Sequence, residues 1–275
     1  MSAPFRQLGL GGGGVKGVLH VGALRELSRR QPLFFPDGVF GVSVGAIMAT
    51  YVAFGLPVDD SVSGLVKKYL SLDAIVPSMT FQNVSAAFAS KGLYDMDVFE
   101  RAIADMFAEA GLDVRGKTLG DARMPLFIVA SNITKGAPAV FSGAVPVMDA
   151  LRCSCCVPGL FKPQELYGQL YVDGGLLAPC LSALAPDALV MSLSGRVGAR
   201  ITPETLGDMG PLEYMRGIFA MSMAHFHDAQ MSPSTLRLFY PGLASDSDLD
   251  EFDVEKIQAA AARQLRDFLG PERAL

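Results

Sequence analysis

The chain contains a Gly-Val-Ser-Val-Gly segment whose central residue is Ser43. It follows an apolar stretch, 38–42, that predicts a strand, and it precedes another, 46–54, that predicts a helix. A serine on a tight strand-to-helix turn needs small neighbours, because its backbone is strained and its side chain must project into a cleft. The helix N-terminus beyond it favours developing negative charge. Ser43 is therefore a candidate nucleophile supported by Gly41 and Gly45, and a glycine-tolerant packing turn is the alternative.

A glycine-rich run, GGGGVKG at 11–17, lies upstream between another expected strand and helix. Its backbone N–H groups can approach an oxyanion or a phosphate closely. A P-loop requires Ser or Thr after its lysine, whereas Gly17 follows Lys16 here. A dinucleotide loop fits the glycine spacing, but the acidic residue 20 positions later, Asp37, precedes its strand instead of ending it. The third reading of this run is an oxyanion hole that faces Ser43.

A serine nucleophile needs a base, and the chain has only three histidines. His225 and His227 lie in a Met-rich segment that predicts a helix, and His20 lies in a helix that we expect to be buried, so all three look structural. The alternative base is a carboxylate. Asp173 ends a strand-like segment, and the two glycines after it let the chain turn tightly and leave the carboxylate uncrowded. An isolated Asp-Gly-Gly is also a common turn.

Strand-like and helix-like segments alternate along the chain, which implies an α/β fold: a three-layer α/β/α sandwich with a mostly parallel central sheet. The expected strands are 5–10, 38–42, 125–131, 137–141, 169–172, 188–193 and 236–240. The expected helices are 17–30, 46–54, 58–72, 97–110, 147–155, 211–230 and 253–269. Neighbouring parallel strands would bring the glycine-rich loop and the Ser43 turn to the same carboxyl edge. No linker divides the chain, so we expect one domain, 1–275, in which 71–95 forms either a mobile cap or an irregular connection.

The composition of the 275 residues, 50% hydrophobic and 19% charged, excludes disordered and coiled-coil classes. The net charge of −5 without a run of like charges argues against a nucleic-acid partner. The four cysteines, three of them crowded at 153–156, do not form the usual paired metal-ligand spacing, so we expect free thiols and no metal or cofactor. Segment 38–58 carries no charge but reads as strand plus helix rather than a membrane span. With no secretory signal, we expect a cytoplasmic protein.

Together the three motifs resemble those of the patatin-like phospholipase family. The signature of that family is a glycine-rich loop, then Gly-x-Ser-x-Gly, then Asp-Gly-Gly or Asp-Gly-Ala, and here these stand as GGGVKG (12–17), GVSVG (41–45) and DGG (173–175). Three further segments are similar to weaker landmarks of the family: ASNITKG (130–136), SCCVPGLFKP (154–163) and FDVEKI (252–257). The Cys-Ser-Cys-Cys before Pro158 departs from the small residues usual there, which concerns substrate fit rather than chemistry. The motif residues around the dyad are Lys16, Gly17, Gly41, Gly45, Gly174 and Gly175.

This resemblance implies a Ser43–Asp173 dyad that cleaves fatty-acyl esters through an acyl-enzyme, without metal or cofactor. It also implies that the backbone N–H groups of Gly12, Gly13 and Gly14 form the oxyanion hole. Its partners would be a phospholipid or another acyl ester and, transiently, a membrane surface. Because a carboxylate is a weaker base than imidazole, the site must be partly desolvated. Lys16 would place the loop or meet a phosphate headgroup. Candidate contacts for the acyl chain are residues 76–93 and Met215, Met221 and Met223.

Two other readings of the motifs remain. One is an esterase with an ordinary Ser-His-Asp triad that uses His225 or His227. The other is a non-catalytic lipid or nucleotide binder that uses the glycine-rich loop. Oligomeric state and headgroup preference have no signature in the sequence.

Overall fold

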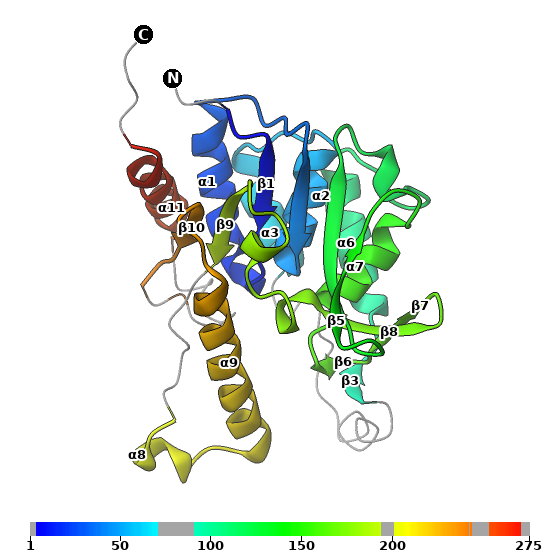
Figure 1. Ribbon diagram of the computed structural model, residues 1–275, viewed down its shortest axis with the longest axis vertical. Coiled ribbons are helices and arrows are strands. Elements are labelled where there is room, and N and C mark those ends of the chain that lie inside the picture. Colours follow the sequence, from blue (N-terminus) through cyan, green and yellow to red (C-terminus); the bar gives the residue numbers. More distant parts are fainter. Residues whose placement is uncertain (1–3, 71–90, 194–200, 242, 244–252, 271–275) are drawn as a thin grey trace.

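A computed structural model describes residues 4–70, 91–193, 201–241, 243 and 253–270 of the chain (Figure 1). The strands are β1 (Gln7–Leu10), β2 (Gly38–Val42), β3 (Gly92–Tyr94), β4 (Leu126–Asn132), β5 (Ala137–Phe141), β6 (Gly159–Phe161), β7 (Gln164–Leu166), β8 (Gln169–Asp173), β9 (Leu189–Leu193) and β10 (Thr235–Leu238). The α-helices are α1 (Val18–Ser28), α2 (Val44–Ala53), α3 (Asp60–Leu70), α6 (Asp97–Glu109), α7 (Val147–Cys155), α8 (Pro203–Leu206), α9 (Pro211–Gln230) and α11 (Val254–Leu269). Four short 3-10 helices are η1 (Gly14–Gly17), η2 (Leu119–Asp121), η3 (Gly174–Leu176) and η4 (Leu181–Ala183).

The central sheet is mixed and mostly parallel, with the strand order β10-β9-β1-β2-β4-β8-β7. The strands from β10 to β4 run parallel. At one edge the direction reverses, because β8 and β5 both pair with β4 in antiparallel fashion. The α/β class with a mostly parallel sheet flanked by helices is therefore confirmed, and the antiparallel edge is an addition that the alternation of strands and helices did not predict.

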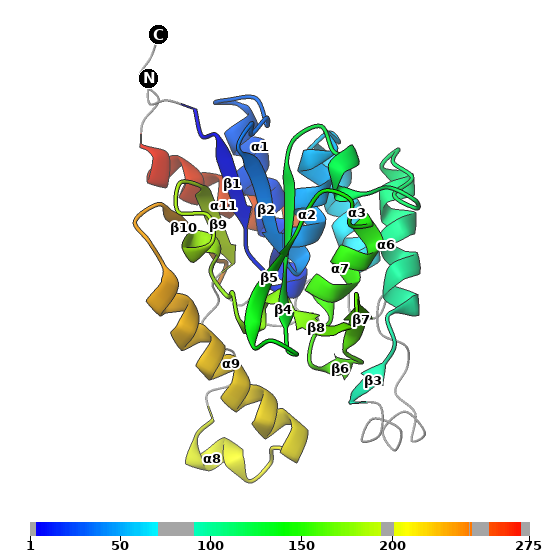
Figure 2. The ribbon, with the colours of Figure 1, turned by 45° about the vertical axis from the view of Figure 1, so that its right-hand side comes forward.

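The two faces of the sheet are covered differently. The larger core contains the buried sides of α1, α2, α3, α6, α7 and α11. A smaller cluster on the other face packs Val42, Val129 and Val190 against the segment that carries η4. The second helical layer is thus reduced here to short 3-10 turns and the chain between them. Figures 1 and 2 show α9 leaving this body and extending past the carboxyl ends of the parallel strands.

Local chemistry explains the helices next to the site. All ten residues of α2 are buried, because this helix lies in the main core behind the sheet. Helix α11 is amphipathic: Asp253 caps its start by accepting hydrogen bonds from the backbone N–H groups of Glu255 and Lys256, and Gly270 ends it with a positive φ of 75°. It packs beside α1, where Gly22 leaves room for the backbone of Gln258.

Two expectations need correction or completion. Helix α2 begins at Val44, directly after the serine, and not at residue 46 as the sequence suggested, so Ser43 itself occupies the N-cap position. Most of the expected cap, residues 71–90, lies outside the described residues. Its remainder contains β3, which pairs in parallel with β6 in a separate two-stranded sheet.

Candidate active site

Ser43 lies on a strained turn between β2 and α2. Its backbone has φ 54° and ψ −128°, a conformation that a non-glycine residue adopts only when its surroundings enforce it. The two flanking glycines permit the close backbone packing that holds Ser43 in this conformation. A Cβ at Gly41 would lie 2.5 Å from the carbonyl oxygen of Gly45. A Cβ at Gly45 would lie 2.0 Å from the carbonyl oxygen of Leu10 at the end of β1. Both glycines are therefore required by close backbone approach.

The glycine-rich loop passes directly over this turn. A Cβ at Gly12 would meet the Cβ of Ser43 at 3.0 Å and its Oγ at 3.8 Å. Gly13 and Gly14 are exposed, with positive φ values of 157° and 57°. Within the described part of the chain, no backbone hydrogen bond outside the helices and strands engages the N–H groups of these three glycines.

Two hydrogen bonds at Gly11 hold the loop in place. The backbone N–H of Gly11 donates to the carbonyl of Met191 on β9 at 2.9 Å. The buried His20 on α1 donates from Nε2 to the carbonyl oxygen of Gly11, also at 2.9 Å. Burial lowers the pKa of His20 to about 4, and this hydrogen bond opposes the shift only partly, so the ring is neutral near pH 7. His20 is thus a positioning residue, in agreement with the structural role expected of it.

Lys16 and Gly17 lie in η1, at the base of the same loop. Lys16 is half-buried, and its backbone N–H donates to the carbonyl of Gly13 at 3.2 Å. Gly17 is buried, and a Cβ there would come within 2.5 Å of a methyl group of Val44, the residue after the serine. The lysine and glycine therefore shape the loop around the Ser43 turn.

Asp173 lies at the end of β8 and is 9% exposed. Its Oδ1 accepts a hydrogen bond from the N–H of Gly175 at 2.8 Å. Gly174 is buried where a Cβ would lie 2.2 Å from the carbonyl oxygen of Val129. The buried hydroxyl of Ser131 completes the turn, because it donates to the carbonyl of Gly174 and accepts from the N–H of Leu177. Gly174 thus permits a close backbone contact with β4, and Gly175 supplies the N–H that binds the Asp173 carboxyl group.

The sheet register brings the serine and the acid to the same level. Val42 pairs with Val129 on β4, and the next residue of β4, Ala130, pairs with Asp173. Ser43 follows Val42, so it and Asp173 flank β4 at nearly the same height. The hydroxyl of Ser43 lies near enough to the carboxyl group to lower its pKa.

The electrostatics of Asp173 are dominated by burial. Desolvation raises the pKa of its carboxyl group to about 6, against the opposing effects of the Ser43 hydroxyl and the Gly175 amide. The second oxygen, Oδ2, is buried and makes no hydrogen bond of standard geometry within the described part of the chain. A desolvated carboxyl group with a spare acceptor oxygen beside a serine is suited to accept a proton near neutral pH.

Ser154 was not predicted from the sequence, yet its hydroxyl connects the backbone of the Ser43 turn to strand β4. Its buried hydroxyl donates to the carbonyl of Val129 at 2.6 Å and accepts from the backbone N–H of Ser43 at 2.9 Å. The carbonyl of Cys156 likewise accepts the N–H of Asp173 at 2.7 Å. The only sequence signal was the SCCVPGLFKP landmark, in which both residues stand. All four cysteines are free and buried, as expected.

Among the described residues, the hydrogen bonds and ring contacts of His225 and His227 go to groups other than Ser43. His227 Nε2 is hydrogen-bonded to the hydroxyl of Ser192 on β9, and its Nδ1 lies 3.5 Å from the carboxylate of Asp228. Ser192 is 2% exposed inside a strand, so this trio ties α9 to the sheet and does not present a nucleophile. His225 stacks edge-on against Phe226.

The chain matches the family model described as patatin-like phospholipase over residues 8–184. This match covers more than half of the chain, so the protein belongs to the patatin-like phospholipase family. The matched region contains the glycine-rich loop, the Ser43 turn and the Asp173 turn.

Several known proteins are similar to this chain. YqhO of Bacillus subtilis (strain 168) is 31% identical over 187 residues, which cover 61% of this chain and 62% of YqhO. The cUMP-AMP-activated phospholipase of Escherichia coli is 28% identical over 231 residues, 72% of this chain and 66% of that protein. The crystal structure of VipD from Legionella pneumophila shares the fold, with a TM-score of 0.51 and 15% identity over 97% of this chain and 67% of VipD. The first curated relatives are matched over 50% to 62% of their own length.

Proposed function

We propose that this protein is a serine-dependent lipid acyl hydrolase of the phospholipase type, which cleaves fatty-acyl ester bonds through Ser43 and Asp173. The observation that carries the proposal is the buried Asp173 carboxyl group, whose pKa is raised to about 6 beside a serine held on a strained turn. Family membership and the phospholipase named among the relatives support a lipid ester as substrate.

The reaction would proceed in two halves. Asp173 accepts the hydroxyl proton as Ser43 Oγ attacks the ester carbonyl, and the carbonyl oxygen takes up the electron pair. The amides of Gly12, Gly13 and Gly14 would stabilise this oxyanion, each contributing about 3 kcal/mol if they act like donors in other hydrolases. When the tetrahedral intermediate collapses, the alcohol leaves with the proton from Asp173. Water then attacks the acyl-enzyme, gives its proton to Asp173, and the fatty acid leaves as Ser43 regains its proton.

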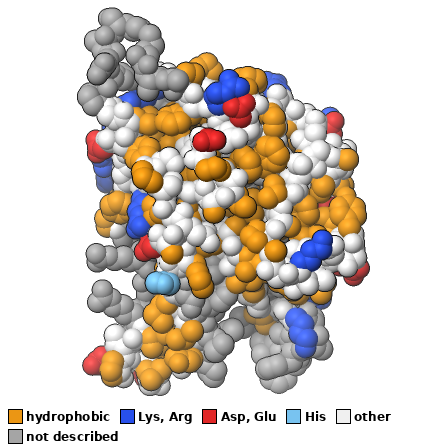
Figure 3. Space-filling model, in the orientation of Figure 1, with side chains coloured by type: hydrophobic (Ala, Val, Ile, Leu, Met, Phe, Trp, Pro, Cys, Tyr) orange, Lys and Arg blue, Asp and Glu red, His pale blue; other side chains and the backbone are white. Residues whose placement is uncertain are grey.

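Helix α9 offers a surface for the lipid. Its exposed apolar side chains include Tyr214, Ile218 and Met221, and Phe226 is 56% exposed. Figure 3 shows hydrophobic side chains gathered over this helix, below the carboxyl edge of the sheet. Because the chain carries a net charge of −5, we propose a transient, mainly apolar contact of a cytoplasmic protein with membranes. No helix within the described residues is long and apolar enough to cross a membrane.

The other expected acyl-chain contacts are less defined. Residues 76–90 and the side chains of Met215 and Met223 lie outside the described part of the structure. Met221 is 43% exposed on α9, where it is available to an acyl chain.

Labelling by a fluorophosphonate probe tests the proposal. The probe should label the wild-type protein and the His225→Ala, His227→Ala double variant, but not Ser43→Ala. Ser192→Ala is the matched control, because it removes the other serine discussed here and should leave labelling intact. Labelling that persists in Ser43→Ala, or that disappears in the folded histidine double variant, would replace the dyad with another nucleophile or an imidazole base. Failure to label the wild-type protein at any pH would favour a non-catalytic binder.

A further inference from the structure

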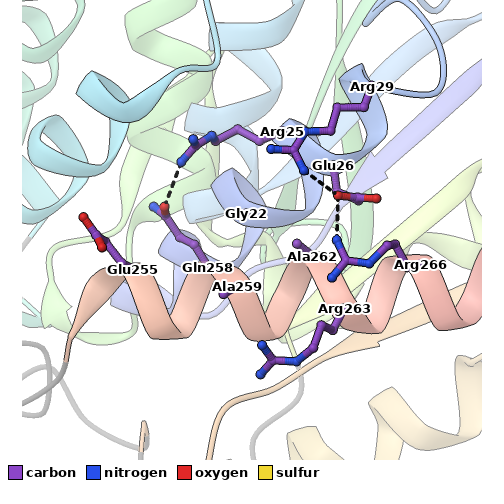
Figure 4. Close-up of a pocket in the computed structure, with 10 residues that line it drawn as sticks. All are labelled: Gly22, Arg25, Glu26, Arg29, Glu255, Gln258, Ala259, Ala262, Arg263 and Arg266. Atoms are coloured by element: carbon purple, nitrogen blue, oxygen red, sulfur yellow. Dashed lines mark hydrogen bonds and ion pairs between the residues drawn. The ribbon is translucent and has the colours of Figure 1, made fainter.

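A hollow lined with arginines lies between α1 and α11, away from the candidate active site. It has a volume of about 420 Å³, within the range of about 300–1,000 Å³ usual for small-molecule sites. Figure 4 shows the side chains of both helices around it. The residues that line it are Gly22, Arg25, Glu26, Arg29, Glu255, Gln258, Ala259, Ala262, Arg263 and Arg266.

The floor of this arginine groove is made of small residues. A Cβ at Gly22 would lie 2.4 Å from the carbonyl oxygen of Gln258, so the two helices touch backbone to backbone at this point. Ala259 and Ala262 continue the lining on α11 without filling the space between the helices. Long side chains therefore rise only at the rim, and the centre stays hollow.

A buried glutamate organises the rim. Glu26 is 4% exposed, and its Oε2 accepts hydrogen bonds from Arg29 at 3.2 Å and from Arg266 at 2.8 Å (Figure 4). Arg29 is on α1 and Arg266 on α11, so one carboxylate fixes guanidinium groups from both walls. Each guanidinium has five N–H donors and uses only part of them on Glu26, which leaves donors in fixed positions for a second anion.

The charge of the groove favours such an anion. Four arginines line it, and only two carboxylates, Glu26 and Glu255, oppose them. This local excess of positive charge stands out in a chain with a net charge of −5. A second hollow, of about 200 Å³, is lined by Asp97, Glu100, Arg101 and Arg115, and there the charges balance.

We propose that the arginine groove binds a small organic phosphate, a molecule of nucleotide size whose phosphate group is held by the guanidinium groups of both helices. Planar guanidinium forks match phosphate oxygens two at a time, which makes arginine the preferred residue for this ligand. The floor of small residues, Gly22, Ala259 and Ala262, would contact the organic part. A phosphate of the same chemistry also occurs on a phospholipid headgroup, and the two sources are separated by experiment.

A ligand in the groove would act on the helix that supports the glycine-rich loop. Helix α1 follows η1 directly, and its His20 donates to the carbonyl of Gly11. Binding across α1 and α11 would stabilise the packing of α1, which should raise the thermal unfolding temperature. This consequence does not depend on hydrolytic activity, so it can be measured in Ser43→Ala protein.

Calorimetric titration with AMP and with inorganic pyrophosphate tests the soluble source, and flotation with phosphatidic acid vesicles, against phosphatidylcholine vesicles, tests the lipid source. The Arg29→Gln, Arg263→Gln double variant should weaken binding of the effective probe at least tenfold. It should also abolish the rise in unfolding temperature that the probe causes in the Ser43→Ala background.

The control is the Arg101→Gln, Arg115→Gln double variant, which changes the net charge equally at the balanced hollow and should bind as wild type. Binding of AMP or pyrophosphate assigns the groove to a soluble phosphate, and binding of phosphatidic acid vesicles alone assigns it to a headgroup. If no probe binds, or if both double variants lose binding to the same extent, the proposal is wrong.

Discussion

Ser43 and Asp173 flank strand β4 at the same height, one after the residue paired with Val129 and the other opposite Ala130. They come from strands on opposite sides of β4, and β8 runs antiparallel to it, so two chain segments of opposite direction meet at this point. The antiparallel edge of the sheet therefore serves the site directly. Although β8 runs antiparallel to β4, its pairing extends only as far as Ala130, so its last residue, Asp173, stays near the carboxyl ends of β2 and β4.

Hydrolysis should depend on pH through the ionisation of Asp173. Asp173 must be ionised to accept a proton, and its pKa is raised to about 6, so kcat/KM for a p-nitrophenyl ester should rise with pH through about 6 and level off above it. His20 is neutral over this range and adds no second rise. A rise centred near 4 would mean that Asp173 is not the base or is not desolvated.

Replacement of Asp173 by asparagine should lower activity and raise stability at neutral pH. Asp173→Asn should lower kcat by about 10²- to 10⁴-fold, the usual contribution of a general base. The folded-state pKa of Asp173 lies above the unfolded value of 3.8, so its contribution to stability is full below pH 3.8 and is lost as pH rises through about 6. Asn carries no charge to desolvate, so the variant should be more stable than wild type at pH 7, by at most about 3 kcal/mol.

Chemical denaturation at pH 4 and at pH 7 measures this difference. The stability gain of Asp173→Asn should appear at pH 7 and vanish near pH 4, where the wild-type carboxyl group is protonated. A gain of equal size at both pH values would show that the effect comes from packing and not from the buried charge.

The main features of the site followed from local sequence patterns. The glycines at 41 and 45 predicted a tight turn, and close backbone contacts explain both of them. The strand-like segment 169–172 predicted that Asp173 ends a strand, and the two glycines after it predicted a tight turn. These features are local, because the strained residue and the glycines that permit its conformation lie within a few positions of each other in the sequence.

Features that depend on distant contacts were not predictable in the same way. Ser154 stands 111 positions from Ser43, and nothing in a helix that ends Cys-Ser-Cys indicates that the Ser154 hydroxyl accepts a hydrogen bond from the Ser43 amide. Strands β6 and β7, each of three residues, are too short to produce an alternating pattern. The antiparallel direction of β8 is likewise set by its pairing with β4 and not by its own residues.

Ser154 should prove to be a positioning residue for the nucleophile. Ser154→Ala removes the acceptor of the Ser43 N–H and leaves the carbonyl of Val129 without this donor, so the turn should shift and kcat should fall by about 10- to 100-fold. The KM should change little, because Ser154 is fully buried and does not reach substrate.

The control for Ser154 is Ser182→Ala. Ser182 is also buried, 5% exposed, and its hydroxyl is hydrogen-bonded to Thr235 and not to the backbone of the Ser43 turn. Both variants should lose comparable stability, about 1–3 kcal/mol each, in urea denaturation. Only Ser154→Ala should lose turnover, and equal kinetic loss in both variants would reduce the role of Ser154 to general packing.

The buried neutral ring of His20 should make the free energy of unfolding fall in acid. Its folded-state pKa of about 4 lies below the unfolded value of 6.5, so its contribution is full above pH 6.5 and is lost as pH falls from 6.5 toward 4. His20→Gln keeps an N–H group that can donate to Gly11 but cannot be protonated, so its stability should fall less steeply over this interval. Parallel pH profiles of unfolding free energy for the two proteins would contradict this account.

Two glycines in helices should respond to alanine in opposite ways. Gly45→Ala places a methyl group 2.0 Å from the carbonyl oxygen of Leu10, where neither backbone can move without disturbing the end of β1, so the variant should lose several kcal/mol or fail to fold. Gly64 is exposed within α3 and has no atom within 4 Å of the position of a Cβ. Gly64→Ala should therefore stabilise the protein by about 0.5–1 kcal/mol, since alanine is the better helix former. Thermal unfolding of both variants measures the contrast. If Gly45→Ala folds with wild-type stability, the serine turn does not pack against the end of β1 as closely as the backbone distances require.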